Sequence, residues 1–191
     1  MNDFYKVIME RRSIRKFKPD PIPKEVLERI IKLGMWAPSA MNTQPWEFYV
    51  FSNAARERIG EILGKSYKNI TPRLKELFLE KMQNIVRYFF SDMGGAPTII
   101  LVLSKKLPVE QYQQGAIQSC AAAIQNLLLA AHIEGLGACW MTGPLWVEEE
   151  VLAYLGRQDD ARMVAAIPIG YPDQTPPTPL RKHETIHWLE D

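Results

Sequence analysis

The chain has 191 residues, 47% of them hydrophobic and 24% charged, which is the composition of one globular domain large enough to bury a core. Its 23 basic and 22 acidic side chains give a net charge of +1. A nucleic-acid-binding domain normally carries a basic excess, so this balance argues against a nucleic-acid partner, and any positive patch must be local.

Apolar periodicity, capping residues and chain breakers divide the sequence into helices and strands. Thr71 as an N-cap and Pro72 at the first helical position set the start of the longer helix in the middle of the chain. No internal repeat or linker interrupts the pattern, which indicates one α+β domain. In chain order, we expect a helix over 3–11, a basic strand-like segment over 12–19, a helix over 23–37, a loop over 39–45, a strand over 46–51, a helix over 53–63, a helix over 71–90, a strand over 96–104, a helix over 110–134, a strand over 138–142, a helix over 147–155 and a strand over 163–171.

Two of these elements have the clearest apolar pattern in the sequence. Residues 96–104 are a nearly continuous apolar run, as in a central strand that is buried on both faces. The helix over 110–134 is apolar nearly all round from 121 to 131, as in a core helix packed on several sides. Polar side chains interrupt this stretch, and it is shorter than the ~20 apolar residues of a membrane span. We therefore expect no membrane partner.

The cysteines and the N-terminus favour a cytoplasmic protein. Cys120 and Cys139 are the only cysteines, and they lie in apolar surroundings without a CxxC or zinc pattern. This is typical of buried free thiols. Residues 1–10 carry acidic side chains and no continuous apolar region, unlike a signal peptide.

The common catalytic motifs are absent from the sequence. There is no GxSxG, P-loop, HExxH or GxGxxG pattern in a fitting context. The three histidines, His132, His183 and His187, are too scattered for a metal site, and the last two lack a third ligand nearby. We expect neither a metal nor a catalytic side chain. An enzyme of this kind relies on a bound cofactor for its chemistry.

Five positive side chains fall within the eight residues from Arg11 to Lys18, with no acidic residue among them. Guanidinium groups pair bidentately with phosphate, and Ser13 adds a hydroxyl donor. The alternative is a solvated basic face at the end of the first helix, where the helix dipole also favours positive charge. Charge alone does not decide between the two.

The loop from Trp36 to Trp46 combines small residues, amide side chains and two tryptophans. Asn42 and Gln44 can each donate and accept hydrogen bonds, which suits the polar edge of a flavin or another heterocycle. The alternative is an ordinary connection between a helix and a strand whose tryptophans fill the core.

Taken together, these two segments resemble the nitroreductase superfamily. The matching motifs are Arg-Arg-Ser-x-Arg-x-Phe at 11–17 and Ala-Pro-Ser-x-x-Asn-x-Gln-Pro-Trp-x-Phe at 37–48. The resemblance continues through Gly-Leu-Gly-Ala-Cys-Trp at 135–140 and Ala-Ile-Pro-Ile-Gly-Tyr-Pro at 166–172, and it is weakest over 65–93. It implies an α+β fold with a mixed, mostly antiparallel central sheet flanked by helices, in an intertwined homodimer.

The resemblance also implies FMN at the dimer interface. It divides the chain into an FMN-binding domain over 1–172 and a C-terminal extension over 173–191 that packs on the partner subunit. That assignment agrees with the apolar Ile186, Trp188 and Leu189, which need a surface to bury them. The cofactor-binding residues that it implies are Arg11, Arg12, Ser13 and Arg15 from one subunit, Pro38, Ser39, Ala40 and Asn42 from the other, Met141, Thr142 and Gly143 beside the central ring, and Arg181 at the phosphate, with Lys182 as the alternative register for Arg181.

The activity that the resemblance implies is ping-pong transfer of a hydride from NAD(P)H, through FMN, to a nitroaromatic, quinone or similar acceptor. Alternatives are a specialised relative, either a dehalogenase or a flavin-cleaving enzyme of cobalamin synthesis, and a non-catalytic flavin- or nucleotide-binding dimer. In this family residues 65–93 vary as a substrate lid. Tyr67 and the aromatic residues 88–90 are either lid residues that line an aromatic pocket or ordinary core residues.

Overall fold

The computed structural model describes residues 3–181 and 186–189. A four-stranded sheet forms its centre, with the strands in the order β1 (Trp46–Ser52), β2 (Thr98–Lys105), β4 (Ala161–Gly170) and β3 (Gly137–Ala138). Every ladder between these strands is antiparallel, and a single parallel bridge joins Ser13 to Ala138. The expected α+β class with a mostly antiparallel sheet is confirmed.

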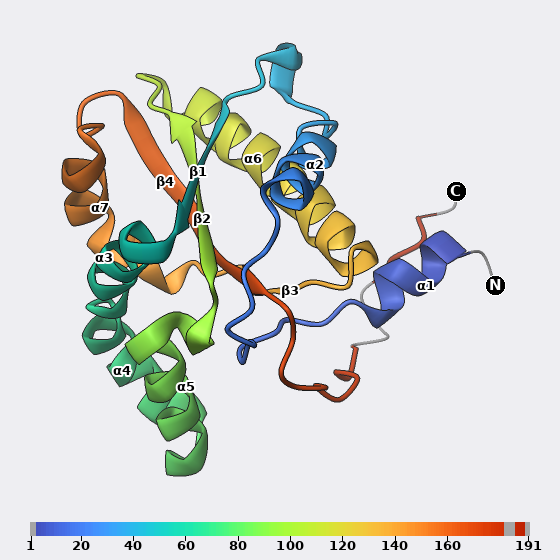
Figure 1. Ribbon diagram of the computed structural model, residues 1–191. Helices are drawn as coiled ribbons and strands as arrows, with labels where there is room; N and C mark the ends of the chain where they lie inside the picture. The colour runs from blue at the N-terminus through green and yellow to red at the C-terminus, as the bar shows by residue number, and fades with distance from the viewer. Residues whose placement is uncertain (1–2, 182–185, 190–191) are drawn as a thin grey trace.

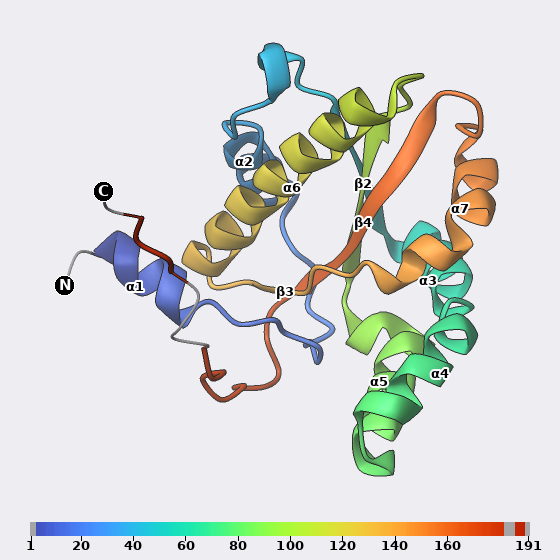
Figure 2. The ribbon, with the colours of Figure 1, turned by 180° about the vertical axis from the view of Figure 1, so that it is seen from behind.

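Helices cover both faces of the sheet (Figures 1 and 2). Helices α2 and α6 lie on one face, and α3, α4, α5 and α7 lie on the other, while α1 projects from the edge near β3. The helices run α1 Asp3–Glu10, α2 Lys24–Gly34, α3 Asn53–Gly64, α4 Tyr67–Leu77, α5 Glu80–Asp92, α6 Glu110–Ile133 and α7 Glu148–Leu155, with 3₁₀ turns η1 Ala40–Asn42, η2 Met93–Gly95 and η3 Gly143–Val147.

The prediction of a central strand buried on both faces is confirmed by β2. Seven of its eight residues, Thr98 to Ser104, are buried. Successive side chains of a strand point to opposite faces, so Ile99, Leu101 and Leu103 enter the core under α3, α5 and α7. Ile100 and Val102 enter the second core, under α2 and α6. One strand thereby joins both halves of the core.

The long core helix is also confirmed, as α6. Within the described part of the chain, α6 is the one helix long and apolar enough to cross a membrane by those criteria alone. Half of its most apolar window is buried inside the protein, and it packs on α2 and the sheet. These contacts are those of the core helix of a globular domain.

The single helix expected over 71–90 is wrong, since two helices, α4 and α5, occupy this region. Thr71 is not an N-cap: it lies inside α4, and its hydroxyl donates to the carbonyl of Tyr67 at 2.8 Å. Pro72 is likewise internal. Phe78 and Leu79 adopt extended backbone between the two helices. They are neither glycine nor proline, so the sequence carries no breaker there.

Three smaller differences concern element boundaries. The second helix begins at Lys24 and ends at Gly34, with Pro23 as its N-cap, so it is shorter than the expected 23–37. In place of the strand expected over 138–142, a two-residue strand, Gly137–Ala138, pairs continuously with β4, followed by an isolated bridge at Met141. The segment 12–19 is extended but joins the sheet only through isolated bridges.

Candidate functional site

The basic segment after α1 runs as extended chain beside β3, η2 and the start of the tail. Ile14 and Phe17 are buried in the core, while the Arg15 side chain is exposed. Gly137 allows the close packing of Ile14, since a Cβ there would lie 2.5 Å from the Ile14 side chain. Backbone hydrogen bonds fix the segment: Ile14 N–H donates to Ala138 O (3.0 Å), Phe17 N–H to Gly94 O (3.0 Å) and Lys18 N–H to Tyr171 O (2.9 Å).

The η2 turn sets the position of Arg15. Gly94 has φ +68°, and a Cβ at this residue would lie 2.2 Å from the Arg15 carbonyl oxygen, so only glycine allows this approach. Arg56 holds the same turn from the other side: it donates to the carbonyl oxygens of Ala96 and Asp92 and to the Asp92 carboxylate, each at 2.7 Å. Arg15 therefore rests on a turn that is itself fastened to α3 and α5.

Three arginines converge near the start of the segment. Burial is the largest cause of the lowered pKa of Arg11, and the positive charges of Arg12 and Arg181 lower this pKa further. Arg12 donates to the carbonyl oxygens of Met9 (2.6 Å) and Arg11 (2.9 Å) and to Thr178 Oγ1 (2.7 Å). Arg11, with the positive charges of Arg12 and Arg181 acting on it, marks a place where a bound anion would be stabilised. Lys182, the alternative to Arg181, lies outside the described residues.

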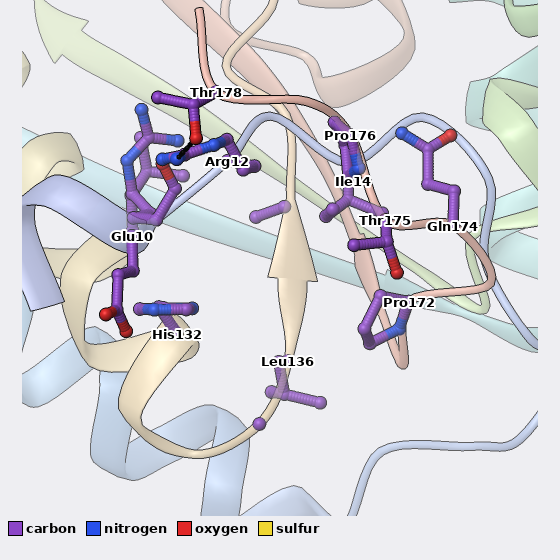
Figure 3. A pocket seen from close by; sticks show the side chains of 14 residues that line it. Glu10, Arg12, Ile14, His132, Leu136, Pro172, Gln174, Thr175, Pro176 and Thr178 are labelled. Atoms are coloured by element: carbon purple, nitrogen blue, oxygen red, sulfur yellow. Dashed lines mark hydrogen bonds between the residues drawn. The ribbon is translucent and has the colours of Figure 1, made fainter.

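A cavity of about 450 Å³ lies at this convergence (Figure 3). Arg11 and Arg12 line it together with His132 at the end of α6 and the tail residues Gln174 to Pro176. In Figure 3 the side chains of Arg12 and Thr178 meet on one side, and those of Glu10 and His132 lie near one another on another side. The lining mixes positive charge, the carboxylate of Glu10, hydroxyl groups and apolar surface.

A second cavity, of about 670 Å³, brings together three further residues expected at a cofactor: Arg15, Met141 and Gly143. Gly143 faces the Phe90 ring, and a Cβ there would lie 3.1 Å from the ring. Thr142, which lies between Met141 and Gly143 in the sequence, is exposed. The remaining lining consists largely of apolar residues of α4, α5 and the connection between them: Ile70, Phe78, Met82, Ile85, Val86, Phe89 and Phe90.

Trp140 and Cys139 also line this second cavity. The indole N–H of Trp140 is buried and has no hydrogen-bond partner within the described residues. A buried donor left unpaired costs about 1–3 kcal/mol, so an acceptor from outside this chain would stabilise the site. Burial raises the pKa of Cys139, although Arg15 and Arg11 lower it in part. Cys139 is therefore a neutral thiol near pH 7 and not a ready nucleophile.

The loop expected to contact the cofactor from the other side lies elsewhere in this chain. Its Ala40 N–H donates to Ser119 Oγ on α6 at 3.1 Å, whereas His132, at the arginine cavity, lies thirteen residues further along the same helix. At 1.5 Å per residue this is about 20 Å. Pro38, Ser39, Ala40 and Asn42 are thus not brought together with Arg11, Arg12, Ser13 and Arg15 within one chain (Figure 1).

The loop itself has a strained and exposed backbone. Met41, Asn42 and Gln44 all have positive φ, at 51°, 54° and 45°. Non-glycine residues adopt such angles only where the surrounding structure enforces them, and they are frequent at binding sites. Hydrogen bonds inside the loop hold it, among them the one that Ser39 Oγ accepts from Gln44 N–H at 3.0 Å, and the Ser119 bond anchors Ala40 to α6. Trp36 and Met41 are 85% and 83% exposed, whereas Trp46 is buried, so the alternative in which the tryptophans fill the core holds for Trp46 and not for Trp36.

The first part of the tail forms a wall of both cavities, which the sequence did not predict. Gln174, Thr175 and Pro176 line the arginine cavity and the Arg15 cavity alike. Asp173 N–H donates to Lys16 O at 2.9 Å, and the two side chains form a salt bridge at 2.5 Å. The charge pair is visible in the sequence, but the path of the chain that brings it together is not.

Among the described residues no group of three histidine, cysteine or acidic side chains is arranged to hold a metal ion. His183 lies outside the described residues. The residues that line the two cavities offer anion binding, hydrogen bonding and apolar contact.

The comparisons with known proteins agree on one family. Residues 8–171 match the model of the nitroreductase family. The "Putative NAD(P)H nitroreductase YfhC" of Bacillus subtilis is 33% identical over 184 residues, 94% of this chain and 91% of the relative. The iodotyrosine deiodinase of Thermotoga neapolitana is 32% identical over 98% of both chains. A solved nitroreductase with bound FMN from Desulfitobacterium hafniense is 25% identical, with a TM-score of 0.78 over the whole of both chains.

Proposed function

Because this chain belongs to the nitroreductase family, we propose that it is an FMN-dependent oxidoreductase that takes electrons from NAD(P)H and passes them to a nitroaromatic, quinone or similar acceptor. The observation that carries this proposal is the pairing of two features in adjacent cavities. One is the convergence of Arg11, Arg12 and Arg181, and the other is the meeting of Arg15 with the Met141–Gly143 turn.

The chemistry of these residues fits FMN. The three guanidinium groups suit its phosphate, and the Ser13 hydroxyl is a further donor on the same extended segment. Arg15, Met141, Thr142 and Gly143 then face the ring system, where Gly143 leaves room and Arg15 supplies a positive charge. The unpaired Trp140 N–H supports the view that an acceptor from outside the chain belongs nearby.

The second wall of the site comes from another copy of the chain in this proposal. Pro38, Ser39, Ala40 and Asn42 lie too far from the arginines of their own chain, about 20 Å along α6. A homodimer with two equivalent sites brings each loop to the partner's arginines. Exposed apolar side chains of the loop, of α6 and of the tail favour such an interface: Trp36, Met41, Tyr112, Ile133, Leu180, Ile186, Trp188 and Leu189.

The tail after Pro172 has two parts in this proposal. Residues 173–178 contact Lys16 and Arg12 of their own chain. The exposed apolar residues from Leu180 onward then extend over the partner subunit. The domain over 1–172 and the extension over 173–191 stay a proposal, in which only the later part of the extension packs on the partner.

FMN, when bound, supplies the hydride and electron transfer itself, and the protein contributes binding, orientation and electrostatics. Arg15 places a fixed positive charge beside the ring system, which favours negative charge on the bound group. The apolar walls from Phe78, Met82 and Phe89 exclude water from one side of this cavity. No side chain of the site is needed as a nucleophile, in line with the neutral thiol of Cys139.

A second candidate activity is reductive dehalogenation of an aromatic substrate. It is favoured by the 32% identity to the Thermotoga iodotyrosine deiodinase, which extends over nearly all of both chains. Both candidates use the same FMN site and differ only in the second substrate.

We propose a cytoplasmic location for the protein. Cys120 and Cys139 are both buried free thiols, as expected in a reducing compartment. Burial raises the pKa of Cys120 to about 12, so this thiol too stays protonated and unreactive.

The visible spectrum of the purified protein tests the proposed activity. After incubation with FMN and gel filtration, the protein should retain a yellow flavin spectrum. Anaerobic NADH or NADPH should bleach it, and a nitroaromatic compound or a quinone should restore it, whereas restoration by a halogenated phenol with halide release would select the second candidate. Colourless protein that takes up no FMN would rule out both, and a spectrum that no nicotinamide nucleotide changes would indicate a binding protein without turnover.

A further inference from the structure

A groove of about 720 Å³ beside α5 is separate from the residues assigned to FMN except for Arg15. It adjoins the Arg15 cavity, because Arg15, Ile85, Phe89 and Gln174 line both spaces. A molecule in the groove therefore lies next to the position proposed for the flavin ring. The groove is a candidate for the second substrate.

One face of α5 lines this groove. Lys81, Asn84, Ile85 and Tyr88 are spaced at i, i+3, i+4 and i+7 and so share that face. Tyr88 is 81% exposed, so it is a wall of the groove and not a core residue. Phe17 and Phe89 add aromatic side chains to the lining. A flat aromatic ligand fits between such walls.

The charges in the groove are unbalanced. Its lining includes three cations, Arg15, Lys16 and Lys81, and one carboxylate, Asp92. Lys16 is already paired with Asp173 and Asp92 with Arg56. Within the described residues, Arg15 and Lys81 take part in no salt bridge. Arg15 serves the flavin in the proposed function, which leaves the charge of Lys81 for another anion.

We propose that the groove binds an aromatic acceptor that carries a carboxylate, and that Lys81 is the residue that selects this carboxylate. The inference rests on the proposed function and names the substrate class of the same site. A nicotinamide nucleotide also carries anionic groups, but its pyrophosphate calls for several donors, whereas Lys81 is a single point charge beside an amide, Asn84. A monoanion is the better match.

The test compares 4-nitrobenzoate with its neutral analogue 4-nitrobenzamide, using the FMN-loaded protein. Binding of each compound is measured by calorimetry without NAD(P)H, and KM and kcat are measured with saturating donor. Replacing Lys81 by Gln should raise the Kd and KM for the benzoate about fivefold more than those for the benzamide, because an exposed charge pair contributes up to about 1 kcal/mol. Lys81→Arg should retain the preference, and ~0.5 M salt should reduce it.

Lys75→Gln is the matched control, since Lys75 is an exposed lysine near the end of α4 that lines neither cavity. It should leave both compounds unaffected. Equal effects of Lys81→Gln on the benzoate and the benzamide, or an effect confined to the KM of NADH or NADPH, would overturn the inference. If the protein takes up FMN and reduces the benzamide but shows no Lys81-dependent preference for the benzoate, the proposed function stands and only this inference is wrong. Failure to take up FMN contradicts the proposed function, and the same calorimetric comparison made on the protein without FMN still tests the groove.

Discussion

At the scale of single residues, the site depends on where a few backbone atoms place charged side chains. Arg15 lines both the Arg15 cavity and the groove beside α5. It is held there because its carbonyl oxygen packs against Gly94 and because Phe17 N–H donates to Gly94 O in the same turn. The motif around Arg11 to Arg15 could be read from the sequence, because its residue types and spacing are specific to the family. The turn that supports it could not, because nothing in Gly94 alone indicates which backbone it touches.

Replacing Arg15 by Ala should weaken FMN binding about tenfold and slow reduction of the flavin by NAD(P)H. The physical reason is the loss of a charge-assisted interaction, which contributes roughly 1.5–3 kcal/mol. Flavin fluorescence titration and stopped-flow absorbance measure the two quantities, and Arg15→Lys, which keeps the charge, should recover part of the reduction rate. If the affinity and the reduction rate both stay at the wild-type values, Arg15 does not have the proposed role.

Replacing Gly94 by Ala should both destabilise the protein and lower its FMN affinity. A matched control is Gly156→Ala, since Gly156 has φ +67° but no atom within 4 Å of a Cβ at that position, and it lines none of the three cavities described above. The control should lose only about 1 kcal/mol from backbone strain and keep its affinity. Urea unfolding and FMN titration compare the two variants, and equal behaviour would show that the contact with Arg15 has no consequence.

At the scale of secondary-structure elements, the sequence predicted best where one signal dominates. The apolar run of β2 and the all-round apolar α6 are placed within two residues of their observed bounds. The helix expected over 71–90 failed because the break at Phe78 and Leu79 involves apolar residues that continue the helical spacing. Of the two, Phe78 lines the Arg15 cavity, and this tertiary role leaves no mark on local propensity.

An ion-pair network joins β1 to the loop before β4 and predicts a pH dependence. Glu47 accepts hydrogen bonds from Arg157 at 2.5 and 2.8 Å, and Arg157 also pairs with Asp160. The Arg157 hydrogen bonds hold the pKa of Glu47 below its ordinary value of 4.5. A lowered pKa in the folded state gives stability that is present above the unfolded pKa and is lost as the pH falls through the folded one.

Glu47→Gln should therefore unfold more readily near neutral pH and lose less stability than the wild type on acidification below about pH 4.5. The Glu47 side chain is 41% exposed, so solvent screening keeps the effect small. Urea unfolding between about pH 7 and pH 3 measures it, with Glu61→Gln on the exposed side of α3 as the control. Parallel pH profiles for Glu47→Gln and the wild type would contradict the role of the network.

At the scale of the whole molecule, the residues proposed for one FMN lie at two distant places in a single chain. Arg11 and Arg12 lie at the cavity near the end of α6, Arg15 and the Met141–Gly143 turn line the cavity next to it, and the strained loop at Ala40 contacts the first half of α6. In the proposed function, such a chain completes an FMN site only beside a second copy. The motifs mark both sets of residues in the sequence, but the distance between the two sets is a property of the fold that the sequence alone does not contain.

A subunit complementation experiment tests this arrangement most directly. Arg15→Ala damages the arginine half-site and Asn42→Ala damages the loop, so each variant alone forms dimers with two impaired sites. A mixed dimer of the two has one doubly damaged site and one site that is fully wild type. The two variants are co-expressed with different tags, and the mixed dimer is purified through both tags. If FMN binds between two copies, this mixed dimer binds one FMN per dimer with wild-type affinity, and NAD(P)H bleaches the bound flavin. A mixed dimer with no site of wild-type affinity would contradict FMN binding between two copies.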